Sequence, residues 1–186
     1  MAATALSPPA VERPLMLVLG ALSVAHLLND LLQSMIPATY PLIKAAYGLD
    51  FAQVGLITLA FQVTSSLLQP LLGWLTDRRP WPYAMVGGMG ATLCGLLGLA
   101  FAGSYGAVLV SVALVGLGSA VFHPEATRMA RHAAAGRQGL AQGVFQVGGH
   151  AGYALGPLLA AAVVVPRGQA SLSWFSGVAL LAMLLM

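Results

Sequence analysis

The sequence predicts an all-α integral membrane protein with six transmembrane helices. Two features of the composition indicate this fold class: 59% of the 186 residues are hydrophobic and only 7% are charged, whereas soluble domains have about 25% charged residues. The third feature is the order of the residues, which form six long apolar runs joined by short polar connections. So few charges cannot cover a water-facing surface, and we therefore expect the chain to lie in the lipid bilayer.

Each apolar run is about as long as, or nearly as long as, the roughly 20 residues that a helix needs to cross the hydrocarbon core. After a cytoplasmic tail of residues 1–13, one six-helix domain is predicted over residues 14–186. Its helices are expected at residues 14–40, 51–75, 82–102, 105–125, 139–165 and 171–186. The last run is still apolar at Met186. We therefore expect a fragment of a longer protein, cut within the sixth helix; a complete chain that ends at the far interface is the alternative.

Basic residues predict the orientation, because they are enriched in cytoplasmic loops. With the N-terminus inside, only Lys44 and Arg167 face outward. Six arginines then face inward: Arg13, Arg78, Arg79, Arg128, Arg131 and Arg137. The basic residues are spread in ones and twos, so the net charge of +3 does not indicate a nucleic-acid partner.

The first helix contains the stretch "HLLNDLLQSM". Its polar members are His26, Asn29, Asp30 and Gln33, which share one helical face because they are three or four residues apart. A charge inside the membrane is costly and usually marks a pathway for substrate or protons. A hydrogen-bonded cluster that only joins helices is the alternative.

The second helix repeats the pattern with uncharged groups. Thr58, Gln62, Ser65 or Ser66, and Gln69 recur at helical spacing. They can line a polar cavity or bond to neighbouring helices, and one role does not exclude the other.

The second helix ends in "GWLTDRR", where a conformational latch is predicted. Gly73 permits a close helix approach, and Asp77, followed by Arg78, can bond to an arginine or to a neighbouring helix end. An ordinary cytoplasmic turn with basic anchors is the alternative.

The fourth helix ends in "FHPEATRMARH". Pro124 is expected to bend or end the helix. His123, Glu125 and Arg128 gather at the cytoplasmic side, with Glu125 and Arg128 three residues apart. This spacing favours a proton-responsive pair or, alternatively, an interfacial salt bridge.

The fifth helix combines a polar stripe with a glycine face. The stripe is formed by Gln142, Gln146, His150 and Tyr153. The face of small residues, which favours tight helix packing, is formed by Gly148, Gly152 and Gly156, and Pro157 follows it. Gly152, Gly156 and Pro157 are expected to bend this helix.

Enzyme and metal chemistry have no motif in this sequence. The four histidines are scattered, without an H-x-x-x-H or C-x-x-C spacing, and no G-x-S-x-G or phosphate loop is present. The sequence therefore predicts no catalytic residue, no metal and no cofactor.

Several of these motifs resemble those of the major facilitator superfamily. "GWLTDRR" resembles the loop signature G-x-L-x-D-[R/K], and "GYALGP" resembles the antiporter signature G-x-x-x-G-P. The long stretches "VGLGSAVFHPEATRMAR" and "GRQGLAQGVFQVGGHAGYALGPLLAA" are similar to the fosmidomycin resistance branch. The resemblance implies the N-terminal half of a twelve-helix fold, built from three-helix inverted repeats, with a second six-helix half as its partner.

The same resemblance implies proton-driven drug efflux by alternating access across a bacterial inner membrane. Its substrate is then a small anionic antibiotic such as fosmidomycin. The proton-coupling candidates are Asp30, His26, His123 and Glu125. The candidates for the substrate cavity are Asn29, Gln33, Gln62, Gln69, Gln146, His150 and Arg128. A sugar or organic-anion transporter of the same fold, or a membrane protein without transport activity, are the alternatives.

Overall fold

The structure, a computed structural model, describes residues 13–79 and 81–186. The predicted tail therefore lies outside the described residues except for Arg13. Helices and turns make up the described part of the chain, in which no strand occurs, and the predicted all-α fold is confirmed. The α-helices are α1 (Met16–Ala38), α2 (Tyr40–Tyr47), α3 (Phe51–Gln62), α4 (Gln69–Arg78), α5 (Ala84–Ala100), α6 (Tyr105–His132), α7 (Gln138–Leu159), α8 (Val165–Arg167) and α9 (Ser176–Leu185).

Two of the long rods contain a π-helical turn. Segment η1 (Val63–Leu67) joins α3 to α4, and η2 (Ala160–Val164) joins α7 to α8. A 3₁₀ segment, η3 (Gln169–Phe175), leads into α9. The rods Phe51–Arg78 and Gln138–Arg167, together with α1 and α6, are long and apolar enough to span a membrane. The two other predicted segments correspond to shorter apolar helices, Ala84–Ala100 and Gln169–Leu185.

Helix α6 does not end at Pro124, where the sequence favoured a bend or an end. The helix continues to His132. Proline removes one backbone hydrogen bond, which membrane helices tolerate when neighbouring helices support the backbone. Such a neighbour is present here, because a Cβ added to Gly73 of α4 would lie 3.3 Å from the Cβ of Pro124.

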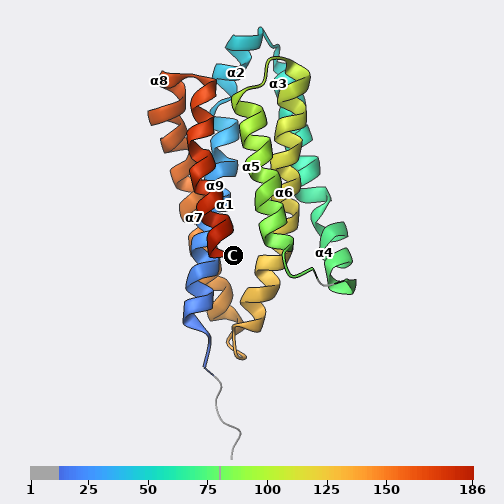
Figure 1. Cartoon of the computed structure of the whole chain (residues 1–186), viewed down its shortest axis with the longest axis vertical. Coiled ribbons are helices and arrows are strands. Elements are labelled where there is room, and N and C mark those ends of the chain that lie inside the picture. The colour runs from blue at the N-terminus through green and yellow to red at the C-terminus, as the bar shows by residue number, and fades with distance from the viewer. Residues whose placement is uncertain (1–12, 80) are drawn as a thin grey trace, which may run out of the picture.

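The helices form an elongated bundle in which α1 packs mainly on α7 and α5 mainly on α6 (Figure 1). Glycine makes the α1–α7 approach possible. A Cβ on Gly152 would lie 2.1 Å from the Leu27 carbonyl oxygen, and one on Gly156 would lie 2.0 Å from Ser34 Oγ. Both distances are far below van der Waals contact, so α1 could not lie this close to α7 with larger residues there.

The interior contains two separate apolar clusters with polar residues between them. On α1, Leu19, Leu22 and Ala25 belong to one cluster, and residues 31, 32, 35 and 36 belong to the other. On α6, Val108–Val115 and Phe122–Ala130 divide in the same way. The polar face predicted for the first helix lies at this division, and it meets polar residues of α6 there.

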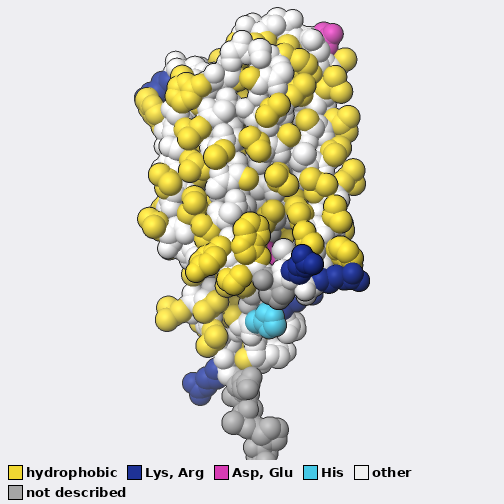
Figure 2. Space-filling model, turned by 45° about the vertical axis from the view of Figure 1, so that its right-hand side comes forward, with side chains coloured by type: hydrophobic (Ala, Val, Ile, Leu, Met, Phe, Trp, Pro, Cys, Tyr) yellow, Lys and Arg dark blue, Asp and Glu magenta, His cyan; other side chains and the backbone are white. Residues whose placement is uncertain are grey.

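The surface is that of a protein surrounded by lipid. Apolar side chains cover the long side of the bundle, whereas Lys and Arg side chains lie at its ends (Figure 2). Leu17 and Phe51 are 91% and 84% exposed. Such a surface is unfavourable in water but matches a hydrocarbon environment.

Candidate functional site

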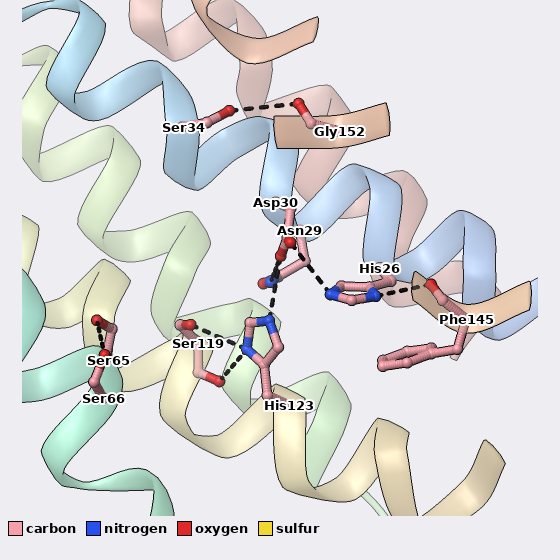
Figure 3. Close-up of polar contacts among 10 residues, drawn as sticks. All are labelled: His26, Asn29, Asp30, Ser34, Ser65, Ser66, Ser119, His123, Phe145 and Gly152. Carbon is pink, nitrogen blue, oxygen red and sulfur yellow. Dashed lines mark hydrogen bonds and ion pairs between the residues drawn. The ribbon is translucent and has the colours of Figure 1, made fainter. Parts of the chain in front are cut away.

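The candidate site is a cluster of three ionisable side chains, His26 and Asp30 of α1 and His123 of α6. Asp30 lies between the two imidazole rings (Figure 3). Its Oδ2 is 3.2 Å from His26 Nε2, and its Oδ1 is 3.3 Å from His123 Nε2. Asn29 adds a hydrogen bond of 3.0 Å from its side-chain amide to Asp30 Oδ1. One carboxylate therefore joins two helices that are far apart in the sequence.

Backbone carbonyls on the far side of each ring fix the two histidines. His26 and Asp30 meet because they are four residues apart on α1. The Nδ1 of His26 is 3.0 Å from the Phe145 carbonyl oxygen, and this ring stacks on that of Phe145 with centroids 4.1 Å apart. The Nδ1 of His123 is 2.9 Å from the Ser119 carbonyl oxygen, one turn earlier on α6. Helices α1, α6 and α7 thus all contribute to the position of Asp30.

The cluster borders a polar cavity of about 150 Å³. Its lining comes from α1, α3, η1, α4, α6 and α7, and consists of Asp30, Gln33, Phe61, Gln62, Ser65, Ser66, Gln69, Ser119, His123 and Tyr153. A second cavity, of about 390 Å³, lies beside it towards the end of α4. Gln69 and His123 line both cavities. The His123 side chain therefore borders both the cavity beside Asp30 and the one towards the end of α4.

A second charged cluster joins α4 to α6 near that end. Arg128 donates a hydrogen bond of 2.7 Å to Asp77 and a second, charge-assisted one to Glu125. Glu125 is buried, with 8% of its side chain exposed, whereas that of Asp77 is 69% exposed. The contact expected from the Glu125–Arg128 spacing is thus present. Asp77 pairs with an arginine, which is one of the two partners expected for it.

The other glutamines and the histidine predicted for the substrate cavity lie in two different environments. Gln33, Gln62 and Gln69 line the cavity beside Asp30. Gln146 and His150 lie on the exposed face of α7, outside the cavities described above. Because the glycine face of α7 packs on α1, these two members of the polar stripe point away from α1, whereas Tyr153 of the same stripe lines the cavity beside Asp30. A role of Gln146 and His150 in a substrate cavity stays a prediction.

The other predicted latch and bend residues are also placed. Gly73 lies against Pro124, while the guanidinium of Arg78 lies 4.1 Å from the centroid of the Trp74 ring and pairs with no carboxylate of the described residues. Gly152 and Gly156 lie in the contact with α1, and Pro157 lies inside α7, just before η2.

Sequence reasoning missed three contributors to the site. Ser119 and Phe145 position the histidines through their carbonyl groups, and any residue type offers such a group, so the sequence has no signal for them. The third is the proximity of His123 to Asp30, which no local spacing reveals.

The cluster also bears on the expected absence of a metal. His26, Asp30 and His123 have one possible ligand atom each within 4.8 Å of one another. The expectation of no metal rested on local spacing alone, and the fold brings these groups together from distant segments. The separations of 3.2 and 3.3 Å are those of ion pairs between the Asp30 carboxylate and the two rings.

This fold and this site define a helical membrane protein with ionisable side chains buried between its spanning helices. The description of the family model that matches residues 22–186 is Major Facilitator Superfamily. The chain therefore belongs to this superfamily of membrane transporters, and its fold is that of a six-helix half, as the sequence predicted.

Two curated relatives narrow the resemblance. The chain is 55% identical to the fosmidomycin resistance protein of Escherichia coli over 91% of its own length and 42% of the relative's. It is 44% identical to the uncharacterized MFS-type transporter YfnC of Bacillus subtilis over 97% of its own length and 44% of the relative's. The chain thus spans less than half the length of both relatives. Its similarity to the fosmidomycin resistance branch, predicted from the long motifs, is confirmed.

Proposed function

We propose that the chain forms the N-terminal part of a proton-coupled exporter of a small anionic drug that works by alternating access. The observation that carries this proposal is the Asp30 carboxylate held between two histidines beside a polar cavity. A buried ionisable group in a membrane costs at least a few kcal/mol, so it is found where it acts on a substrate or a proton. Asp30 is the proposed proton carrier.

The histidines make Asp30 suited to this role. Histidine is the side chain that ordinarily changes charge between about pH 5 and pH 8. A proton that arrives from the outside at Asp30 therefore alters the hydrogen bonds between α1 and α6. This change biases the equilibrium between inward-open and outward-open states, because a ligand shifts two states only when it binds them differently.

The proposed substrate class rests on the cavity and on the relatives. The cavity offers hydroxyl and amide donors from Ser65, Ser66, Gln62 and Tyr153, next to the His123 imidazole. Donors of this kind suit an oxyanion such as a phosphonate. The name of the Escherichia coli relative refers to fosmidomycin, which is an anionic phosphonate. A cavity of about 150 Å³ is smaller than most ligand pockets, which run from about 300 Å³, and we propose that the second six-helix half completes it.

The orientation and the latch complete the proposal. We place the protein in a bacterial inner membrane with its N-terminus in the cytoplasm, because the arginine-rich ends of α4 and α6 then face inward. The Asp77–Arg128–Glu125 cluster then holds α4 against α6 at the cytoplasmic side and favours one state of the cycle.

The experiment is drug export by the full reading frame that contains this chain, with Asp30→Asn as the test variant. In proteoliposomes with an imposed proton gradient, we expect gradient-driven fosmidomycin export by the parent protein and loss of the gradient dependence in the variant. A drug-sensitive bacterial host should show the same loss as renewed susceptibility. Export by Asp30→Asn that still follows the proton gradient would refute the role of Asp30.

Asp50→Asn is the matched control, because it makes the same chemical change at an exposed carboxylate. Asp50 caps α3, where it accepts a hydrogen bond from the Gln53 amide, and asparagine caps helices about as well. This variant should export like the parent protein. Absence of drug export by the parent itself would contradict the proposed substrate while leaving the fold assignment intact.

A further inference from the structure

We infer that His26, Asp30 and His123 bind protons as one unit, and that the arrangement seen here is the state that holds four. Loss of one of these protons opens the Asp30–His123 contact between α1 and α6. The inference deepens the proposed proton coupling and rests on it, since it specifies which contact the transported proton makes or breaks.

The Nδ1 atoms of both histidines carry a proton. Each faces a backbone carbonyl oxygen, that of Phe145 at 3.0 Å or that of Ser119 at 2.9 Å. A carbonyl oxygen only accepts hydrogen bonds, so each Nδ1 must carry a proton. The Ser119 hydroxyl, 3.2 Å from His123 Nδ1, shares that proton as a second acceptor. These two contacts account for two of the protons.

The contacts of the two Nε2 atoms with Asp30 need two further protons. With Nδ1 protonated, the Nε2 of a neutral imidazole is an acceptor. Each Nε2 nevertheless faces an oxygen of Asp30, at 3.2 and 3.3 Å. An acceptor does not bond to an ionised carboxylate, so each of these contacts needs a proton of its own. The cluster therefore holds four protons.

The net charge of the three groups is the same whichever atoms hold the four protons. If Asp30 is ionised, both rings are imidazolium, and the three groups together carry one positive charge. If instead Asp30 carries a proton, it donates to one neutral ring while the other ring is imidazolium, and the sum is the same. Since Asn29 donates to Oδ1, a proton on the carboxyl group belongs on Oδ2, which faces His26.

Of the two contacts of Asp30, the one with His123 is the one that opens. Removing one proton places two lone pairs against each other in one of the N···O contacts. His26 is buried, stacked on Phe145 and on the same helix as Asp30, so its contact is constrained on several sides. His123 comes from the other helix, and 24% of its side chain is exposed towards the two cavities. The proton therefore leaves at His123, and the α1–α6 contact is lost.

Within residues 13–79 and 81–186, few other titratable groups face this unit. From α7, Tyr153 lines the cavity next to Asp30 and His123. Asp77 of α4 and Arg128 and Arg131 of α6 line the cavity on the other side of His123, and Glu125 is bonded to Arg128. Helices α3 and α9 and segment η1 contain no acidic or basic residue, and α5 has only the exposed thiol of Cys94. The three groups can therefore exchange a proton without a fourth group taking it up inside the cluster.

Solid-state NMR of the protein in lipid bilayers tests the inference directly. Histidine labelled with ¹⁵N shows whether each ring nitrogen carries a proton, and ¹⁵N–¹³C dephasing to labelled aspartate detects the contact between His123 Nε2 and Asp30. Single His26→Gln, His123→Gln and Asp30→Asn variants assign the signals by their loss. The proton count and the contact are measured on the parent protein, and the variants serve only to assign its signals. If one variant folds poorly, the signal of its residue is assigned as the one that remains after the two other variants have assigned theirs.

We expect the contact to be present only when four protons are counted on the two rings and the carboxyl group. As the pH is raised until one proton is lost, the dephasing should disappear and His123 should become neutral. A contact that persists with three protons would overturn the inference. Two neutral rings whose Nε2 signals shift when a chelator is added would overturn it too, since a metal ion would then hold the groups together.

The outcome is independent of the transport experiment. If the four-proton state is found but Asp30→Asn still exports with the gradient, the proposed coupling fails and the cluster is a structural proton site. If Asp30→Asn is uncoupled but the contact does not follow the proton count, the coupling stands and this inference fails.

Discussion

Helix α6 takes part in two charged clusters about one turn apart, and the cation differs between them. In the inner cluster two histidines face the carboxylate of Asp30, and the group lies between the two apolar cores. In the outer cluster one arginine faces Glu125 and Asp77 near the end of the bundle. Arginine stays protonated in proteins, whereas histidine gains and loses its proton near neutral pH. The inner cluster can thus change its charge, while the outer one opens mainly by movement of its helices.

Removal of Arg128 should have the largest effect on stability. Arg128→Met keeps much of the side-chain volume but leaves Glu125 buried without its partner. Loss of one partner of a buried pair costs about 3 kcal/mol, so we expect a clear loss of stability in thermal or denaturant unfolding of the protein in detergent. The double variant Arg128→Met, Glu125→Gln should recover most of this loss. An equally unstable double variant would show that the effect comes from packing instead.

Replacement of His123 should have an intermediate effect. His123→Phe keeps a ring next to Phe122, whose centroid is 5.4 Å away, but removes both nitrogens. Asp30 keeps its contacts with His26 and Asn29, so the change removes one charge-assisted hydrogen bond, worth about 2 kcal/mol. The same unfolding assay measures it. His132→Phe, at the exposed end of the same helix, is the control and should be close to neutral; a similar loss in both would argue against a specific bond.

The smallest effect is expected for Asp77. Because its side chain is 69% exposed, its pair with Arg128 is largely screened by water, and Asp77→Asn should cost about 0.5 kcal/mol. The salt dependence of the two stability effects also distinguishes the clusters, since exposed pairs are screened more than buried ones. The difference between Asp77→Asn and the parent should therefore vanish in about 1 M salt, whereas that for His123→Phe should persist. An Asp77 effect that survives high salt would mean that this contact is less accessible to water than its exposure indicates.

The two clusters also show what the sequence could and could not predict. Neighbours on one helix could be predicted from spacing, as for His26 with Asp30 and Glu125 with Arg128. The membrane fold followed from composition and from apolar runs of spanning length. Contacts between helices depend on how each helix is rotated, and spacing does not contain that rotation. His123 was a candidate for proton coupling and His150 for the substrate cavity, but spacing could not show that His123 faces Asp30 while His150 lies on the exposed face of α7.

The extent of α6 beyond Pro124 and the two π-helical turns were missed for a related reason. Hydropathy records which residues are apolar, whereas these features depend on which backbone hydrogen bonds the packing allows. A glycine on the neighbouring helix, Gly73, makes room for Pro124, and its effect appears only when both helices are in place.

Segment η1 sets the rotational phase of the rod that runs from Phe51 to Arg78. A π turn accommodates one residue more than an α turn. Gln62 can therefore face the cavity while Gly73 and Asp77 face α6 only as long as Val63–Leu67 stays π-helical. If this turn relaxed to an α turn, everything after it would rotate by about 100° around the helix axis. Asp77 would then swing away from Arg128 while Gln62 stayed at the cavity. One turn of backbone thus couples the part of the cavity lining that precedes it to the outer cluster that follows it.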